Sequence, residues 1–416
     1  MKRTYFNSVG LWVTVVALIC LSLTTTAFSQ EAQTDQDYSF YTPSASNEPY
    51  EPMSGSKVKN VILLIGDGMG LTQVAAARIK ATGADGRLYL EKTSVVGLAR
   101  THSADNLVTD SAASGTALST GYKTNNEMVA VSPDGSMLRT ILEEAGIEGR
   151  FTGLVVTSSI THATPAVFAS HVRSRSQQAD IAAELLDNRV NVLLGGGLAF
   201  FLPKPVVATQ ATTHPQTQPV SPSQRDDQRD LIAEARDAGY LVVETSEELR
   251  SADADYVLGL FALDAMTTRP PEPSLAELTR KAIWLLQENK KGFFLMVEGS
   301  QIDWACHRND LGETIRQLLL FDQAVKAALD FARKDKHTLV IVTADHETGG
   351  MAITGGSLDG KELSVKWTTT GHTAVPVPVY AYGPKATYFD GVYDNTDIPK
   401  KLSKLMGLEL QPKGDD

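Results

Sequence analysis

The feature that most constrains the fold is a series of short apolar runs, each followed by polar or glycine-rich residues. The first run, Val58 to Ile65, leads directly into Gly-Asp-Gly-Met-Gly. Such a run is typical of a buried strand of a parallel sheet that ends in a loop. Further strands are predicted at Gly153–Thr157, Val190–Leu194, Leu241–Val243, Phe293–Val297, Thr338–Thr343 and Val377–Tyr382.

Helical patterns lie between most of these runs. The expected helices span Leu71–Thr82, Ala112–Thr120, Leu138–Ala145, Gln177–Asp187, Gln228–Ala238, Ser274–Asn289 and Gly312–Arg333. Strands that alternate with helices indicate an α/β fold with a mainly parallel sheet covered on both faces. We therefore expect a three-layer α/β/α sandwich with a large central sheet.

The N-terminus is expected to be a leader and not part of this fold. Two basic residues precede an apolar run from Val9 to Leu23, and small residues follow it. This pattern predicts a secretory signal peptide over residues 1–29, and hence a periplasmic or secreted protein. The alternative is a membrane anchor, for which the run is short. Cys20 leaves a lipoprotein open, although Ile19 is a poor residue before a lipidated cysteine.

Composition divides the rest of the chain. Residues 30–56 are polar and rich in Ser, Thr, Pro and acids, which predicts a flexible lead-in. One domain is expected over residues 57–416. Within it, residues 203–227 are rich in Pro, Thr, Gln and Ser, and they are interpreted as a surface insertion because the strand and helix alternation resumes after them.

Charge and cysteine content exclude some classes of protein. Removal of Lys2 and Arg3 with the leader, from 38 basic and 49 acidic residues, leaves a net charge of −13. An acidic surface argues against nucleic acid or an anionic membrane as the main partner. Cys306 is the one cysteine outside the leader, so an intrachain disulfide is excluded. Cys306 is either a small buried residue or a free thiol.

Residues that can bind metals follow several predicted strands. Because ligands of open parallel sheets bind beyond the carboxyl ends of the strands, these residues are expected at one edge. They are Asp67, Thr157, His162, Thr164, Glu298, Asp345 and His346. Carboxylate and imidazole groups are common ligands of divalent metals. The sequence therefore predicts a metal centre at this edge of the sheet.

Two further candidate ligands, Asp303 and His307, are four residues apart. On a helix both would face the same side and could bind one ion, although this spacing alone is a weak signal. His372 lies in Thr-Gly-His-Thr-Ala, before the last predicted strand. It is the histidine available late in the chain to complete a nitrogen-rich site.

Ser111, which precedes a stretch of small helical residues, is the candidate nucleophile. A serine there could simply cap the helix. A helix N-terminus also favours anions, however, and suits a phosphorylated serine. No Gly-x-Ser-x-Gly elbow surrounds it, which argues against an esterase triad. Arg175 could hold two phosphate oxygens, and Arg173 is the competing candidate.

Six segments together resemble the motifs of alkaline phosphatases, in the order expected for that family. They are NVILLIGDGMG (60–70), VTDSAASGTALSTG (108–121), THATPAVFASHVRSR (161–175), VEGSQIDWACH (297–307), TLVIVTADHETGG (338–350) and TTGHTAVPVPVYAYGP (369–384). The resemblance covers essentially the whole chain after residue 57. It implies a catalytic domain over 57–416, hydrolysis of phosphate monoesters, and a homodimer.

The resemblance also implies roles for individual residues. Ser111 would attack phosphorus and form a phosphoserine that water then hydrolyses, and Arg175 would bind the phosphate. The implied ligands are Asp303, His307 and His372 for a first zinc ion, Asp67, Asp345 and His346 for a second, and Asp67, Thr164 and Glu298 for a third ion, usually magnesium.

Two positions depart from the best-known bacterial pattern of this family. His162 stands where an aspartate is often found, and Trp304 where a lysine is often found. His162 could ligate the third metal directly, which leaves the identity of that metal open. Loss of a lysine removes a positive charge beside the phosphate, so we expect looser phosphate binding.

Other activities on the same architecture are the nearest alternatives. A sulfatase would need a modifiable Cys or Ser in its own motif, and Ser111 lies in a different context. Phosphodiesterases usually lack the carboxylate of the third site, so Glu298 favours monoesters. A non-catalytic phosphate- or metal-binding protein is disfavoured because Ser111 and every implied ligand are present.

Overall fold

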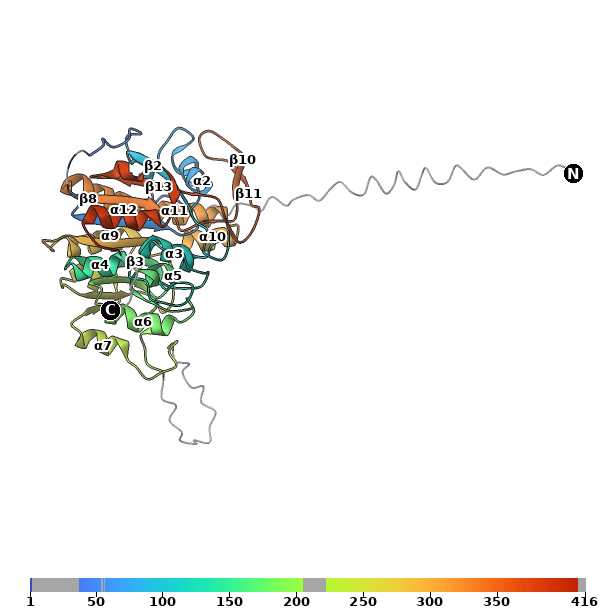
Figure 1. Cartoon of the computed structure of the whole chain (residues 1–416). Coiled ribbons are helices and arrows are strands. Elements are labelled where there is room, and N and C mark those ends of the chain that lie inside the picture. The colour runs from blue at the N-terminus through green and yellow to red at the C-terminus, as the bar shows by residue number, and fades with distance from the viewer. Residues whose placement is uncertain (2–36, 54, 56, 205–221, 411–416) are drawn as a thin grey trace. The chain divides into compact units, whose positions relative to one another are not determined.

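A ten-stranded sheet forms the centre of the fold (Figure 1). Its strands are β1 (Asn60–Gly66), β2 (Val95–Arg100), β3 (Phe151–Ser159), β4 (Val192–Gly196), β5 (Leu241–Val243), β6 (Val257–Leu260), β7 (Phe293–Gly299), β8 (Thr338–Thr343), β13 (Val377–Tyr382) and β14 (Gly391–Asp394). Their order is β14-β2-β13-β8-β1-β7-β3-β4-β6-β5. Among the described strands of this sheet, only β13 runs antiparallel to its neighbours. The expectation of a large, mainly parallel central sheet is confirmed.

The computed structural model describes Met1 and residues 37–53, 55, 57–204 and 222–410. The predicted signal peptide and most of the predicted insertion lie outside the described residues, as do residues 411–416. The description below concerns the unit that begins at Gln36.

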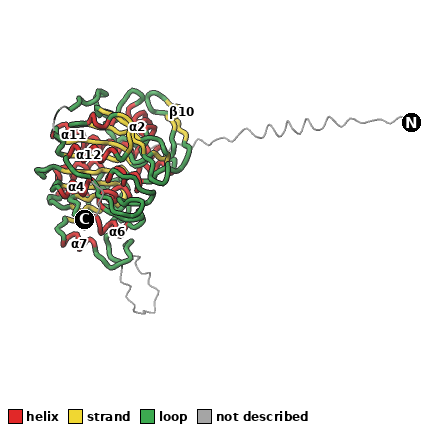
Figure 2. Tube along the Cα trace, in the orientation of Figure 1, coloured by secondary structure: helices red, strands yellow, loops and turns green. Residues whose placement is uncertain are grey.

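Helices cover the sheet. They are α2 (Leu71–Thr82), α3 (Ser111–Thr120), α4 (Ile141–Ile147), α5 (Ala163–Ala169), α6 (Gln178–Asp187), α7 (Leu231–Asp237), α8 (Ser246–Ser251), α9 (Leu275–Leu286), α10 (Gln301–His307), α11 (Leu311–Asp335) and α12 (Asp397–Met406). Helices α2 and α9 both pack against α11 and form one group. Helices α3, α4, α5 and α12 pack together in a second group. Figure 2 shows the strands in yellow between red helices.

The burial of the central strands explains why apolar runs in the sequence predicted them. Every residue of β1, β7 and β8 is buried. A strand buried on both faces needs apolar side chains at consecutive positions, since neither face meets water. All seven predicted strands and all seven predicted helices are present, with some ends shifted by a few residues.

Each strand that the sequence did not predict has six residues or fewer, including the fully buried β6. Strand β2 alternates between buried and exposed residues, and β14 is largely exposed. Four more short strands form two small two-stranded sheets: β9 (Glu347–Thr348) pairs with β12 (His372–Thr373), and β10 (Ala352–Gly356) pairs with β11 (Leu363–Lys366). None of these contains a long apolar run.

Residues 37–53 lie within the segment expected to be a flexible lead-in, yet they pack against the folded unit. The Tyr41 hydroxyl donates to Asp322 Oδ2 of α11 at 2.6 Å, and Tyr38 donates to the carbonyl of Gly312 at 3.1 Å. Tyr41 is buried. Aromatic side chains therefore anchor a segment whose polar composition suggested disorder.

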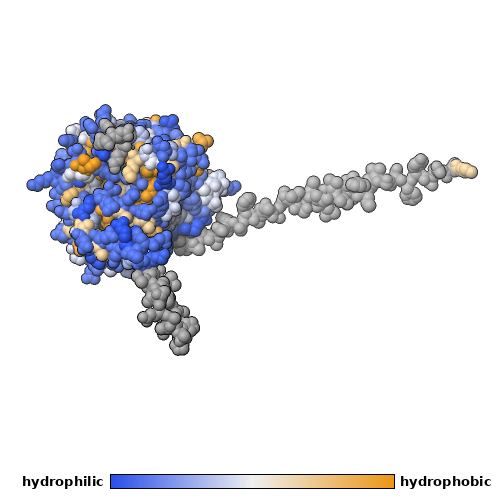
Figure 3. All heavy atoms as spheres, turned by 60° about the horizontal axis from the view of Figure 1, so that its bottom comes forward, coloured by the Kyte–Doolittle hydropathy of each residue, from blue (hydrophilic) through white to orange (hydrophobic). Residues whose placement is uncertain are grey.

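The surface in Figure 3 is mainly hydrophilic, with small separate apolar areas. Among the described residues, no helix is both long enough and apolar enough to cross a bilayer.

Candidate metal centre

The carboxyl ends of adjacent central strands place the candidate ligands side by side. In the sheet, β1 lies between β7 and β8, and Ile65 is paired with both Glu298 and Thr343. Asp67 therefore leaves β1 beside the end of β7, and close to the loop that carries Asp345. The expected convergence at one edge results directly from this register.

One group consists of Asp67, Asp345 and His346, whose ligand atoms lie within 4.8 Å of one another. All three side chains are fully buried. His346 Nε2 is 3.1 Å from Asp345 Oδ2 and 3.6 Å from Asp67 Oδ1. Both carboxylate oxygens of Asp67, and Asp345 Oδ2, have no hydrogen-bond partner among the described residues. Buried carboxylate oxygens without donors are costly unless a cation binds them, so this group fits a divalent metal.

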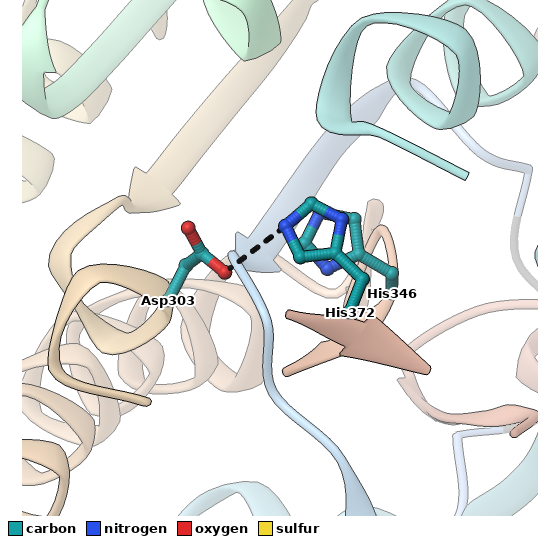
Figure 4. A group of neighbouring side chains, drawn as sticks. All are labelled: Asp303, His346 and His372. Carbon is teal, nitrogen blue, oxygen red and sulfur yellow. Dashed lines mark ion pairs between the residues drawn. The ribbon is translucent and has the colours of Figure 1, made fainter. Parts of the chain in front are cut away.

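A second group contains Asp303, His346 and His372 (Figure 4). His372 Nε2 is 3.6 Å from Asp303 Oδ1, and the His346 and His372 rings stack with centroids 3.6 Å apart. His307, one turn after Asp303 on α10, places its Nε2 3.2 Å from Asp303 Oδ2 and 3.1 Å from His372 Nε2. The helical spacing of Asp303 and His307 is confirmed, since α10 spans both.

The backbone sets the tautomers of His307 and His372. His307 Nδ1 is 2.6 Å from the Thr370 carbonyl, and His372 Nδ1 is 2.8 Å from the Thr109 carbonyl. A carbonyl only accepts, so each neutral ring carries its proton on Nδ1 and leaves a lone pair on Nε2. The two Nε2 lone pairs then face each other at 3.1 Å. That arrangement is repulsive unless a proton or a metal ion lies between them.

The third group brings together Asp67, His162 and Glu298. Glu298 Oε2 accepts from the Ser300 hydroxyl at 2.8 Å. By contrast, Glu298 Oε1, Thr164 Oγ1 and His162 Nδ1 have no hydrogen-bond partner in the described part of the chain. Carboxylate and hydroxyl oxygens suit Mg²⁺, whereas an imidazole favours a softer metal such as Zn²⁺. The chemistry of the group is therefore compatible with either ion.

Burial shifts the pKa of several of these groups in the absence of a cation. Burial, and then the charge of Asp345, raise the pKa of Asp67 well above its usual range. Burial raises the pKa of Glu298 to about 7. The hydrogen bond to Asp303 raises the pKa of His307 to about 8. A bound divalent cation would reverse the penalty on the carboxylates, because it stabilises their charged form.

Ser111 is the first residue of α3, and it lies beside the metal-binding groups. Its Oγ is 3.2 Å from His346 Nε2. The N-cap of α3 is Asp110, whose Oδ1 accepts from the backbone N–H of Ala113 at 2.9 Å. The Ser111 hydroxyl is therefore not needed to cap the helix, and its place at the helix N-terminus favours an anion attached to it.

The arginine nearer to this site is Arg175. Its Nη1 is 3.2 Å from Asp110 Oδ2, and its Nη2 is 3.3 Å from His162 Nε2. The exposed Arg173 instead donates to the carbonyl of Asp134 at 3.1 Å. Trp304 contacts His162 edge to face, with ring centroids 5.8 Å apart. Arg175, His162 and Trp304 thus line one side of the site.

Two residues that contact the candidate site residues were not predicted from the sequence. Asp110 both caps α3 and pairs with Arg175. Thr348 donates its hydroxyl to Asp303 Oδ1 at 2.5 Å, and its Oγ1 is 3.2 Å from His346 Nδ1. A threonine two residues after Asp345-His346 carries no distinctive signal. Cys306 is fully buried, and burial raises its pKa to about 12, so it is no reactive thiolate.

Known proteins resemble this chain in both sequence and fold. The model of the family described as alkaline phosphatase matches residues 58–364 and 360–408. Alkaline phosphatase 3 of Bacillus subtilis is 37% identical, over 89% of this chain and 93% of its own length. Alkaline phosphatase from the Antarctic bacterium TAB5, whose structure is known, is 34% identical to this chain. The two structures match with a TM-score of 0.74 over 85% of this chain and 99% of that one.

The chain belongs to the alkaline phosphatase family. Membership of this family makes it a metal-dependent hydrolase of phosphate monoesters. The family fold places the carboxyl ends of β1, β7 and β8 at the metal-binding groups described above. The predicted family and enzyme class are confirmed.

Proposed function

We propose that the chain hydrolyses phosphate monoesters through a phosphoserine intermediate on Ser111, with two zinc ions and one magnesium ion. The observation that carries this proposal is the position of Ser111. Its Oγ lies 3.2 Å from His346 Nε2, at the N-terminus of α3 and beside groups of unpaired metal-ligand atoms. A nucleophile with this environment suits transfer of an anionic phosphoryl group.

We assign the metal ligands as three sets. Asp303, His307 and His372 hold the first zinc, Asp67, Asp345 and His346 hold the second, and Asp67, Thr164 and Glu298, with His162 as an alternative ligand, hold magnesium. A TAB5 alkaline phosphatase variant with a histidine replaced by glutamate has magnesium bound in its M3 site, so a related protein can hold magnesium there. When bound, the metal ions supply Lewis acidity that stabilises the entering and leaving oxygens.

The chain's own residues then perform the transfer. Ser111 Oγ attacks phosphorus, the bond from phosphorus to the ester oxygen breaks, and the alcohol leaves with a proton. The N–H groups of the first turn of α3 and the Arg175 guanidinium bind the phosphoryl oxygens. Asp110 orients Arg175 through their 3.2 Å contact. Water attacks the phosphoserine, the bond from phosphorus to Oγ breaks, and Ser111 regains its proton as phosphate leaves.

His162 and Trp304 are proposed to border the substrate. His162 Nε2 lies 3.3 Å from Arg175 Nη2, and burial together with Arg175 lowers the pKa of His162 to about 4, so its ring is neutral. A neutral imidazole and an indole add no positive charge to the phosphate site. We therefore propose that phosphate is bound mainly by Arg175 and the metals.

The remaining assignments concern the whole protein. We propose that residues 1–29 direct export to the periplasm or medium, that residues 57–416 form the catalytic domain, and that the enzyme is a homodimer. The leader pattern and the family's usual assembly support these proposals.

A substrate and metal assay tests the proposed function. The purified protein is assayed with p-nitrophenyl phosphate and with bis-p-nitrophenyl phosphate, before and after chelation. We expect strong turnover of the monoester that chelation abolishes and zinc plus magnesium restore. Preference for the diester would indicate a phosphodiesterase instead, and metal binding without turnover of either ester would indicate a binding protein. Trapping of labelled phosphate on Ser111 at low pH, and its loss in Ser111→Ala, tests the intermediate.

A further inference from the structure

Thr348 lies between the two proposed zinc sites. It is fully buried on β9, which pairs with β12 so that Thr348 is opposite His372. Its hydroxyl contacts Asp303 Oδ1 at 2.5 Å and His346 Nδ1 at 3.2 Å. One neutral side chain therefore contacts a ligand assigned to the first zinc and a ligand assigned to the second.

The direction of these two hydrogen bonds follows from the chemistry of the groups. An ionised carboxylate only accepts, so the single hydroxyl proton of Thr348 goes to Asp303. Toward His346, the hydroxyl oxygen can then only accept, which requires the proton of that ring on Nδ1. His346 Nε2 is left with its lone pair, and it faces Asp345 Oδ2 and Asp67 Oδ1 at 3.1 and 3.6 Å. This tautomer is the one that can bind a metal at Nε2.

We propose that Thr348 is a positioning residue that couples the two zinc sites through its hydroxyl. It orients the Asp303 carboxylate for the first ion, and it fixes the tautomer and ring orientation of His346 for the second. An ion at either site holds one end of the hydrogen-bonded chain in place and so favours the arrangement that the other ion needs. This inference rests on the zinc ligands proposed above.

The surroundings hold the hydroxyl in place. The backbone N–H of Thr348 donates to the carbonyl of Gly68 at 3.2 Å. A Cβ at Gly68 would lie 2.8 Å from Thr348 Oγ1, so a glycine is needed for the loop after β1 to come this close. The neighbouring Glu347 ties β9 to α2, because its Oε1 accepts from Gln73 Nε2 at 2.6 Å. Thr348 is thus fixed from both sides.

The experiment compares zinc affinities in variants of the full chain. Thr348→Val keeps the shape and removes the hydroxyl, Thr348→Ala provides a second hydroxyl-free variant, and Thr348→Ser restores the hydroxyl. Thr279→Val is the matched control, because Thr279 is also fully buried but its hydroxyl donates to the Leu275 carbonyl within α9. Both zinc affinities are measured by competition with a chromophoric chelator, and ¹¹³Cd-substituted protein reports each site by NMR.

We expect Thr348→Val to weaken zinc binding at both sites by about 10- to 100-fold, the usual effect of losing a partner of a metal ligand. Both ¹¹³Cd resonances should shift, Thr348→Ser should recover the wild-type values, and Thr279→Val should not change them. Folding of each metal-free variant is checked by circular dichroism, and Thr348→Ala replaces Thr348→Val if the latter does not fold.

Three results separate this inference from the proposed function. Unchanged affinities at both sites in a folded hydroxyl-free variant would overturn the inference, and so would weakening at one site alone. Neither result would affect the proposed function, provided that the wild-type chain binds two zinc ions and hydrolyses the monoester. Failure of the wild-type chain to bind zinc would overturn both.

Discussion

At the scale of single residues, the contacts of Arg175 and Arg173 distinguish the two candidate arginines. Arg175 is held by Asp110 and His162, whereas Arg173 points to the Asp134 carbonyl. The two arginines are only two positions apart in the sequence, yet their surroundings differ completely. Their roles can therefore be separated by mutation.

We expect Arg175→Ala to reduce kcat/KM for p-nitrophenyl phosphate by about 10²- to 10³-fold, since a group that stabilises transition-state charge is lost. Arg173→Ala, the matched control, should stay within about threefold of wild type because a solvent-exposed contact contributes little. Steady-state kinetics at saturating metal provides the measurement. Full activity in Arg175→Ala would refute its assignment as the phosphate-binding arginine.

Replacement of Trp304 by lysine tests the proposed weak binding of product. Trp304 contacts His162 beside the phosphate site, so a lysine there would add a positive charge near the product anion. We expect inorganic phosphate to inhibit Trp304→Lys more strongly than wild type, by about tenfold for one favourable charge interaction of about 1.4 kcal/mol. Trp284→Lys is the control, because Trp284 is 43% exposed on α9. Weaker inhibition in Trp304→Lys would contradict the expectation.

At the scale of secondary-structure elements, α3 must pack closely against α5 to place Ser111. Gly115 makes this possible: a Cβ at that position would lie 2.8 Å from Val167 Cγ2 of α5. The residues of α3 are all buried, so the helix has no exposed face toward which it could move. The small residues around Ser111 are thus explained by packing.

Gly115→Ala should destabilise the protein by about 1 to 3 kcal/mol through overpacking. Gly146→Ala in α4 is the matched helical control, since its Cβ would meet only Thr152 Cγ2, at 3.9 Å. That variant should be neutral or stabilised by up to about 1 kcal/mol, because alanine favours a helix. Urea unfolding measures both, and Val167→Ala in the Gly115→Ala background should recover part of the loss. Equal stabilities for the two glycine variants would exclude the packing argument.

At the scale of the whole molecule, Asp322 joins the N-terminal segment to the core. The buried carboxylate accepts hydrogen bonds from the Tyr41 hydroxyl and from the backbone N–H groups of Tyr89 and Leu90. Burial nevertheless raises its pKa to about 6, from 3.8. The folded state therefore binds more protons than the unfolded state between these values. This group makes the free energy of unfolding fall as pH rises through that window.

Tyr41→Phe removes one donor to Asp322 and should raise its pKa further. We expect the variant to lose about 1.5 to 3 kcal/mol of stability at pH 8, where the carboxylate is charged. The loss should be smaller at pH 5, where the native carboxyl group is mostly protonated. Urea unfolding of metal-loaded protein at both pH values gives the comparison, with Tyr388→Phe as control because Tyr388 is 48% exposed. A loss that does not depend on pH would rule out the link to Asp322.

The sequence by itself determined the central strands, the helices between them, and the set of candidate metal-binding residues. Strands buried on both faces require consecutive apolar side chains, and loops that bind metal require carboxylates and histidines, so both leave a local pattern. Asp67, Glu298 and Asp345 could be found in this way, because each lies in or beside the end of a buried strand.

Only the tertiary structure decided which candidate ligands lie within reach of one ion, which arginine pairs with Asp110 at the N-cap of α3, and what holds these side chains in place. The partners of Thr348 are Asp303 and His346, one of them 45 positions away, and the carbonyl that orients His372 belongs to Thr109. Residues 37–53 likewise looked disordered by composition, and they are anchored by Tyr41 at Asp322, 281 positions away. Such contacts arise when the sheet register brings distant segments together, and no local pattern records them.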